Sequence, residues 1–203
     1  SVWTGITVNW APHTNVNFYD VQADTSPNFN SPAFLQASKS YINNTEGNND
    51  TEHFFQDLYF GQLYYWRVRA RSTVDTTSWQ LSTFITRDSV TMTFPANGSA
   101  GWLGFTANWA PHTGVDFYDL QADTSLSFAS PALVQFSKTY INSTEGNSDT
   151  QHSFTDLYFG VNYFWRVRAR NAVDTSKWMT PWTYFVWDSV ALTSPANLAN
   201  VWT

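Results

Sequence analysis

One unit of about 100 residues, a common domain size, occurs twice in the chain and constrains the fold more than any other feature. Residues 7–14 (TVNWAPHT) return 99 positions later as residues 106–113 (TANWAPHT). The run WRVRAR occupies residues 66–71 and again residues 165–170. Because the 203 residues hold two such units, the sequence predicts two small domains of the same fold in tandem.

Apolar and polar residues alternate with a period of two in both units, which favours strands over helices. In residues 64–71, Tyr64, Trp66, Val68 and Ala70 alternate with Tyr65 and three arginines. We expect strands at residues 7–10, 18–23, 34–42, 53–58, 64–71, 81–86 and 90–94, with turns between them. Seven short strands in a unit of about 100 residues are typical of a β-sandwich.

The corner before the fifth expected strand carries a more specific pattern. A Leu is followed six residues later by a Tyr in both units, and tryptophans occupy the second and sixth strands of a sandwich. These positions are Leu58, Tyr64, Leu157, Tyr163, Trp10, Trp109, Trp66 and Trp165. The pattern resembles the fibronectin type III family, whose corner Tyr bonds back to the corner backbone. Residues 95–98 resemble the inter-domain start of many bacterial secreted and cell-surface members.

The resemblance implies an all-β fold of two tandem fibronectin type III-like, or Ig-like, β-sandwiches with seven short strands each. The two ends of the sequence are out of phase with the repeat, because the chain opens with VWT at residues 2–4 and closes with VWT at residues 201–203. We therefore expect a first domain at residues 1–87 without its strand A and a second at residues 88–187. Residues 188–203 are expected to be strand A and the start of a third repeat, or a strand donated to another molecule.

Composition limits the function. The net charge is −6, no block of basic residues occurs and there is no Cys, which argues against nucleic-acid binding and thiol chemistry. No apolar run reaches the roughly 20 residues of a membrane helix, so no membrane span is expected in this segment. No nucleophile, zincin or phosphate-loop motif occurs, and lone histidines such as His13 and His112 fit turns. We expect no enzyme activity and no cofactor.

A polar loop in each unit is the one candidate for a cation. Glu46, Asn48 and Asp50 alternate in the first unit, and Glu145 and Asp149 occupy equivalent positions in the second. Oxygen ligands of this kind suit Ca²⁺. The loop lacks the EF-hand pattern, however, and a solvated turn explains it equally.

Several short motifs fit glycosylation. Asn43, Asn142, Asn49 and Asn97 stand in N-x-[ST] sequons. Thr76, Ser89 and Ser189 each follow an Asp, a pattern that resembles O-glycosylation in some bacteria. We expect these residues to be acceptors on the surface of a glycoprotein.

Trp178, Trp182 and Trp187 are concentrated late in the second unit. An exposed row would form a platform that stacks sugar rings, whereas packing at the sandwich edge would bury the rings instead.

The sequence predicts an extracellular or cell-surface structural array that forms or extends a fibre or adhesin. Its partners would be neighbouring repeats or identical subunits, head to tail, with strand donation as one way to join them. The alternative is an accessory module of a secreted enzyme or adhesin that binds surface glycans or proteins.

Overall fold

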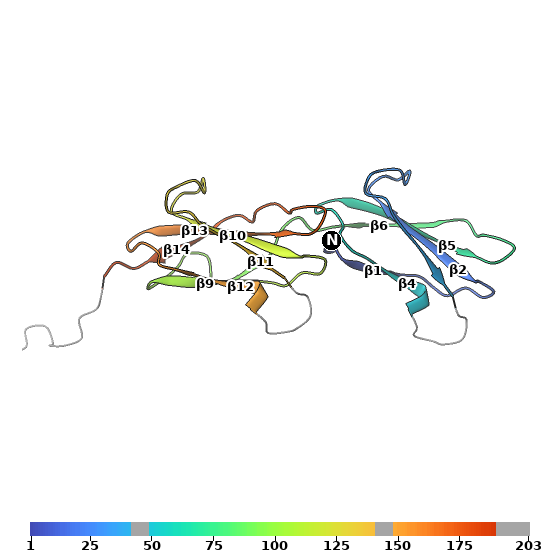
Figure 1. Ribbon diagram of the computed structural model, residues 1–203, viewed down its shortest axis with the longest axis horizontal. Coiled ribbons are helices and arrows are strands. Elements are labelled where there is room, and N and C mark those ends of the chain that lie inside the picture. Colours follow the sequence, from blue (N-terminus) through green and yellow to red (C-terminus); the bar gives the residue numbers. More distant parts are fainter. Residues whose placement is uncertain (42–48, 141–147, 190–203) are drawn as a thin grey trace, which may run out of the picture.

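The computed structural model describes residues 1–41, 49–140 and 148–189, and in these ranges almost all of the regular secondary structure is strand. Two β-sandwiches lie end to end (Figure 1). The helical residues form two single turns, η1 (Asn49–Thr51) and η2 (Ser148–Thr150). The expected all-β fold with two tandem sandwiches is confirmed.

The first sandwich contains two sheets. One pairs β1 (Ile6–Asn9) with β4 (Glu52–Phe55). The other has the order β3–β2–β5–β6, with bounds β2 (Phe18–Asp24), β3 (Leu35–Ser40), β5 (Leu63–Arg71) and β6 (Gln80–Ile85). An isolated parallel bridge joins Val2 to Thr86 at the end of this sheet.

The second sandwich repeats this plan and adds two strands. Its smaller sheet has the order β12–β9–β7, with bounds β7 (Met92–Phe94), β9 (Gly104–Trp109) and β12 (Gln151–Thr155). Its larger sheet has the order β11–β10–β13–β14–β8, with bounds β8 (Ser99–Gly101), β10 (Phe117–Asp123), β11 (Val134–Thr139), β13 (Asn162–Arg170) and β14 (Trp182–Val186). The strand β8 pairs in parallel with β14.

The cores follow from the period-two pattern. In the first sandwich Val21 pairs across the sheet with Val68, and both belong to a buried cluster with Tyr64. In the second, Leu120 pairs with Val167, and both lie in one cluster with the fully buried Trp165. Burial of these apolar faces between two sheets is the main stabilising term of such a fold.

Most expected strands lie close to the observed ones, and the differences have local reasons. The expected strand at residues 53–58 ends at Phe55, because Asp57 adopts a left-handed conformation with φ of 55°. The strand β8 was not expected, because three residues with two small side chains, Ala100 and Gly101, carry no alternation that marks a strand.

Candidate functional site

The first repeat has an open sheet edge beside a hollow. Within the described residues, β1 pairs only with β4, so its other edge has no neighbouring strand. A hollow of about 460 Å³ lies beside this edge, and Trp10, Trp66, Val68 and Leu81 are among the residues that line it. Apolar walls next to unpaired backbone groups are the features that bind an extended peptide segment.

The second repeat shows what occupies the equivalent place. There β7 pairs with β9, with Met92 opposite Trp109, and Ala110 N donates a hydrogen bond of 2.9 Å to Thr91 O. Val90 and Met92 are buried in the same cluster as Trp109. The hollow of the first repeat is therefore the position that residues 88–94 fill in the second.

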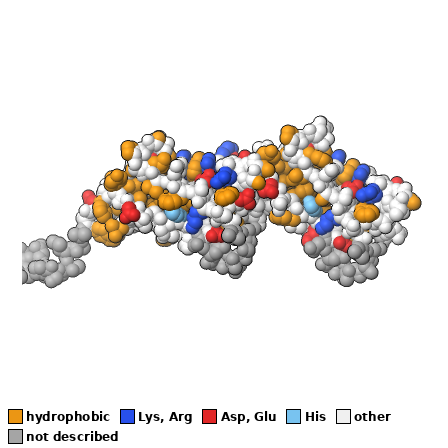
Figure 2. Space-filling view, in the orientation of Figure 1, with side chains coloured by type: hydrophobic (Ala, Val, Ile, Leu, Met, Phe, Trp, Pro, Cys, Tyr) orange, Lys and Arg blue, Asp and Glu red, His pale blue; other side chains and the backbone are white. Residues whose placement is uncertain are grey.

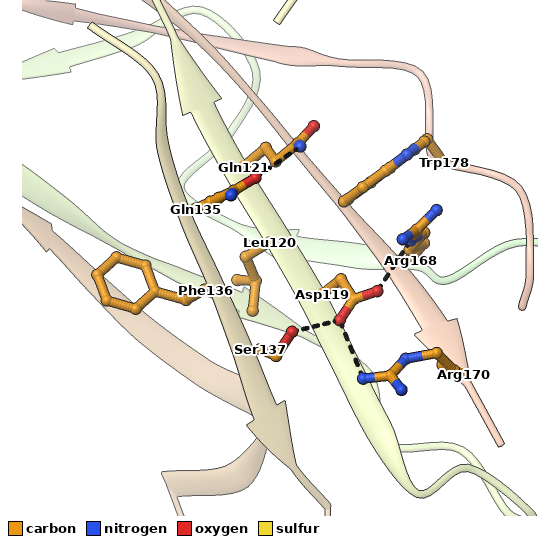
Figure 3. A pocket seen from close by; sticks show the side chains of 9 residues that line it. All are labelled: Asp119, Leu120, Gln121, Gln135, Phe136, Ser137, Arg168, Arg170 and Trp178. Carbon is orange, nitrogen blue, oxygen red and sulfur yellow. Dashed lines mark hydrogen bonds and ion pairs between the residues drawn. The ribbon is translucent and has the colours of Figure 1, made fainter. Parts of the chain in front are cut away.

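The outer face of the larger sheet carries a charged groove in the second repeat (Figure 3). The Asp119 carboxylate accepts hydrogen bonds from Ser137 Oγ at 2.6 Å and Arg168 Nε at 3.0 Å. It also lies 3.5 Å from Arg170 Nη2. These bonds leave the carboxylate paired, which suits a structural ion pair better than acid–base chemistry.

Aromatic rings cover the arginines of this face. The guanidinium carbons of Arg166 and Arg168 lie 4.5 and 4.4 Å from the centroid of a Trp178 ring. Arg166 also lies 3.7 Å from the Phe128 ring. Burial lowers the pKa of Arg166, and the charge of Arg168 lowers it further. We call these stacked arginines and aromatic rings the arginine ladder. The ladder ties the long connection at residues 171–181 to the sheet through cation–π contacts.

The same ladder occurs in the first repeat. Arg69 Nε donates to Asp20 Oδ2 at 3.0 Å, and Arg67 and Arg69 lie over Trp79. Burial acts to raise the pKa of Asp20, but hydrogen bonds from Ser38 and Arg69 and the charge of Arg71 outweigh it and leave the pKa below its usual value.

A joint between the repeats brings together residues more than 100 positions apart. Thr4 Oγ1 donates to Gly114 O at 2.7 Å, and Phe60 N donates to Asp174 Oδ2 at 2.8 Å. The backbones approach so closely that a Cβ on Gly114 would lie 2.3 Å from the amide nitrogen of Gly5. Figure 1 shows the N-terminus lying between the two sandwiches, where this joint forms.

His112 is buried in the joint. Its ring stacks on Trp3 with centroids 3.4 Å apart, and the guanidinium carbon of Arg87 lies 5.3 Å from the centroid of the Trp3 ring. Burial, together with the charge of Arg87, lowers the pKa of His112 to about 4 although a backbone contact at Pro111 acts in the opposite direction. The sequence predicted that His112 lies in a turn. Its burial could not be predicted, because Trp3, which covers its ring, belongs to the other repeat.

The residues expected to define the fold line the corner and the core. Tyr64 Oη accepts a hydrogen bond of 3.1 Å from Tyr59 N, and Tyr163 Oη accepts one of 3.0 Å from Tyr158 N. Leu58, Leu157, Trp109 and Trp165 are buried, whereas Trp10 and Trp66 are half-buried beside the hollow. A hydroxyl of the corner Tyr that bonds the backbone five residues earlier fixes the corner.

The three late tryptophans lie in three different surroundings. Trp178 lies against the arginine ladder, and Trp182 packs against the core with its ring edge-on to Trp165 at 5.8 Å. Trp187 is exposed and meets Trp102 with centroids 5.0 Å apart. The structure therefore does not bring them together as one row, because Trp178 lies in the connection before β14, Trp182 begins β14 and Trp187 follows its last residue.

The structure describes five of the seven expected glycosylation residues. Asn97, Thr76, Ser89 and Ser189 are exposed, and Asn97 Oδ1 accepts a hydrogen bond of 2.8 Å from Thr183 N. Asn49 begins η1. Asn43 and Asn142 lie outside the described residues.

Of the weak Ca²⁺ candidates, the structure describes Asp50 in η1 and Asp149 in η2. Glu46, Asn48 and Glu145 lie outside the described residues. Among the residues that are described, no group of three or more His, Cys, Asp or Glu side chains is placed to hold a metal ion.

No helix in the described part of the chain has the length and apolar character needed to cross a membrane. No protein-family model and no curated protein matches the sequence.

Solved structures of similar fold were found. One is a segment of two fibronectin type III domains from chicken tenascin, with 13% identity, coverage of 90% of this chain and 92% of that chain, and a TM-score of 0.39. Another contains domains FN1–FN3 of chicken CNTN1, with 12% identity, coverage of 92% of this chain and a TM-score of 0.36. The match spans only 64% of the CNTN1 chain. With the sheet orders and corner geometry described above, the chain folds as two tandem fibronectin type III-like β-sandwiches.

Proposed function

We propose that this chain is an extracellular structural repeat module that extends a surface fibre or adhesin and is joined head to tail by β-strand addition. The observation that carries the proposal is the open edge of β1 beside its hollow, at the place that β7 fills in the second repeat. Strand addition supplies main-chain hydrogen bonds along the edge and side-chain burial in the hollow.

The occupant we propose is residues 188–192 of a second copy. Their sequence, DSVAL, matches DSVTM at residues 88–92, so Val190 and Leu192 would take the places of Val90 and Met92. The Ala11 amide would donate a hydrogen bond to the added strand, since its equivalent Ala110 N donates to Thr91 O. A contact between the tail of one copy and the head of the next is heterologous and produces an open filament.

The proposed role is structural, with no reaction assigned to the chain. Thr76, Ser89, Ser189 and Asn97 are exposed on the described surface, which supports our proposal that the module is a secreted glycoprotein.

The test compares particle mass before and after denaturation for the native chain and for Ala11→Pro and Val190→Asp. Proline at residue 11 removes the amide donor that the strand would use, and Asp at residue 190 places a charge where an aliphatic side chain is needed. Leu126→Asp, on an exposed loop of the second repeat, is the matched control. Circular dichroism and a melting curve verify that each variant folds.

We expect filaments that dissociate on denaturation to chains of 23.1 kDa plus any glycan, and loss of filaments in both edge variants but not in the control. Filaments that stay large in denaturant would show a covalent array and overturn strand donation between copies. Single two-repeat particles at all concentrations would overturn the structural role.

A second candidate function is binding of a surface glycan or protein. It is favoured by the groove of about 540 Å³ beside Asp119, Gln121, Arg168 and Trp178, which offers donors, acceptors and an aromatic ring (Figure 3). Calorimetric titration with a panel of glycans tests it, and binding that is lost in Trp178→Ala but kept in Trp79→Ala would support this role.

A further inference from the structure

The free end of the second sandwich carries an apolar surface, which we call the tail surface and define as Trp102, Leu103, Tyr158, Phe159 and Trp187. All five side chains are exposed, Phe159 by 56%. Figure 2 shows hydrophobic side chains gathered at this end of the molecule, next to the point where the chain leaves the second sandwich. Contiguous apolar surface of this kind marks an interaction site.

The equivalent surface of the first repeat is already occupied. Phe60, which corresponds to Phe159, is only 3% exposed, because loops of the second repeat cover it in the joint. One backbone contact beside the two surfaces is the same: Arg87 N donates to Val2 O at 2.6 Å, and the equivalent Trp187 N donates to Gly101 O at 2.9 Å. The tail surface thus has the shape that receives a head loop of this repeat.

The head loop that fits is present and free on the first repeat. In the covered joint the turn at residues 171–175 holds Asp174, with Thr175 N donating to Oδ1 and Phe60 N donating to Oδ2. The turn at residues 72–76 is built in the same way: Thr76 N donates to Asp75 Oδ1 at 2.8 Å. Within the described residues nothing donates to Asp75 Oδ2, and nothing accepts from the amide of Phe159.

The aromatic contact has an equivalent too. His112 stacks on Trp3 in the covered joint. His13 and Trp102 hold these positions at the free ends, and both are exposed. The two free ends therefore carry both halves of two contacts of the existing joint, Asp174 with Phe60 and His112 with Trp3.

Several other positions differ between the two pairs of surfaces, including Asn171, whose Nδ2 donates to Leu58 O at 2.9 Å and which corresponds to Ser72. Thr4 and Arg87 of the covered surface correspond to Leu103 and Trp187, and Lys177 of the covering loops corresponds to Ser78. The ion pair of Lys177 with Asp88, at 2.6 Å, thus has no equivalent at the free ends. Asn15 replaces Gly114, so the backbones cannot approach as closely as in the covered joint.

From these equivalences we infer that the tail surface of one copy binds the head loops of the first repeat of a second copy, in a joint that is more apolar and less charged than the one within the chain. Asp75 of the second copy accepts a hydrogen bond from Phe159 N, and His13 stacks on Trp102. This inference rests on the proposed head-to-tail assembly and names the surface that aligns it.

The absence of Cys in the chain allows a clean cross-linking test. Val74→Cys, next to Asp75, is mixed with Tyr158→Cys, next to Phe159, and treated with a short bis-maleimide. Both side chains are well exposed, so the substitutions leave the folds intact. The double variant Val173→Cys with Tyr59→Cys reports the existing joint as a positive control, and Leu126→Cys with Val74→Cys is the negative control.

We expect a dimer from the mixed pair and none from the negative control. Asp75→Ala in the Val74→Cys chain should reduce the dimer yield about tenfold, as loss of a central interface contact does. Filaments that form and dissociate as proposed but give no dimer would overturn the tail surface while keeping the structural role. Chains that neither associate nor cross-link would overturn both, and dimer formation unaffected by Asp75→Ala would overturn the assigned docking.

Discussion

The two repeats share sequence and fold but differ in how well their cores are closed. In the second, β7 covers Trp109 and the cluster around the fully buried Trp165. In the first, Trp10 and Trp66 are half-buried and border a hollow of about 460 Å³. The difference teaches that one short segment, residues 88–94 with the buried Val90 and Met92, decides whether the same sandwich has a closed core or an acceptor edge.

The largest expected effect tests this difference directly. Trp165→Ala should reduce the free energy of unfolding by about 3–5 kcal/mol, because a large, fully buried ring leaves a cavity. Trp66→Ala should cost about half as much, because its ring is already partly exposed at the hollow. Urea titrations followed by circular dichroism measure both; equal losses would show that the hollow does not loosen the first core.

The joint should weaken in acid. Because the pKa of His112 is about 4 in the folded chain and ordinarily 6.5, the unfolded chain binds a proton first as the pH falls. Stability is therefore full above pH 6.5 and decreases between pH 6.5 and 4, by on the order of 3 kcal/mol. Comparing the pH dependence of unfolding with His112→Phe, whose ring can still stack on Trp3, isolates this term; identical slopes would contradict it.

Exchanging the residues at one position of the two heads sharpens the comparison of the joints. Gly114→Asn introduces a Cβ against Gly5 N and should destabilise the joint by about 1–3 kcal/mol. Asn15→Gly, at the free head, should change stability by less than about 0.5 kcal/mol. Thermal unfolding and the rate of proteolysis between the repeats report the two effects. A Gly114→Asn chain with native stability would mean that the joint adjusts without cost.

The smallest effect concerns the ladder that both repeats share. Asp20→Asn should cost about 1 kcal/mol, because the carboxylate is partly buried but its arginines are a third exposed. The contribution of Asp20 is present above its ordinary pKa of 3.8 and is lost as the pH falls below it, since its folded pKa is lower. Asp119→Asn provides the matched measurement in the second repeat; a tenfold difference in the unfolding constant between the two would show that the ladders are not equivalent.

Particular residues show how much of the fold and of the candidate site the sequence predicted. Alternation at residues 64–71 predicted β5 and its buried face, because period two is a local property of a strand with one face in the core. The Leu58 and Tyr64 spacing predicted the corner through its resemblance to the corner of fibronectin type III domains. The late tryptophans were ambiguous, since Trp178 precedes β14, Trp182 begins it and Trp187 follows it, and residues outside one strand share no periodic signal.

The sequence by itself determined the repeat, the sandwich fold and the face of each long strand, because these depend on neighbours close along the chain. Only the tertiary structure decided that Trp10 borders a hollow, that His112 is buried against Trp3 and that Phe159 is exposed where Phe60 is covered. Each of these depends on contact between segments far apart in the sequence. Identical residues in the two repeats therefore have different environments.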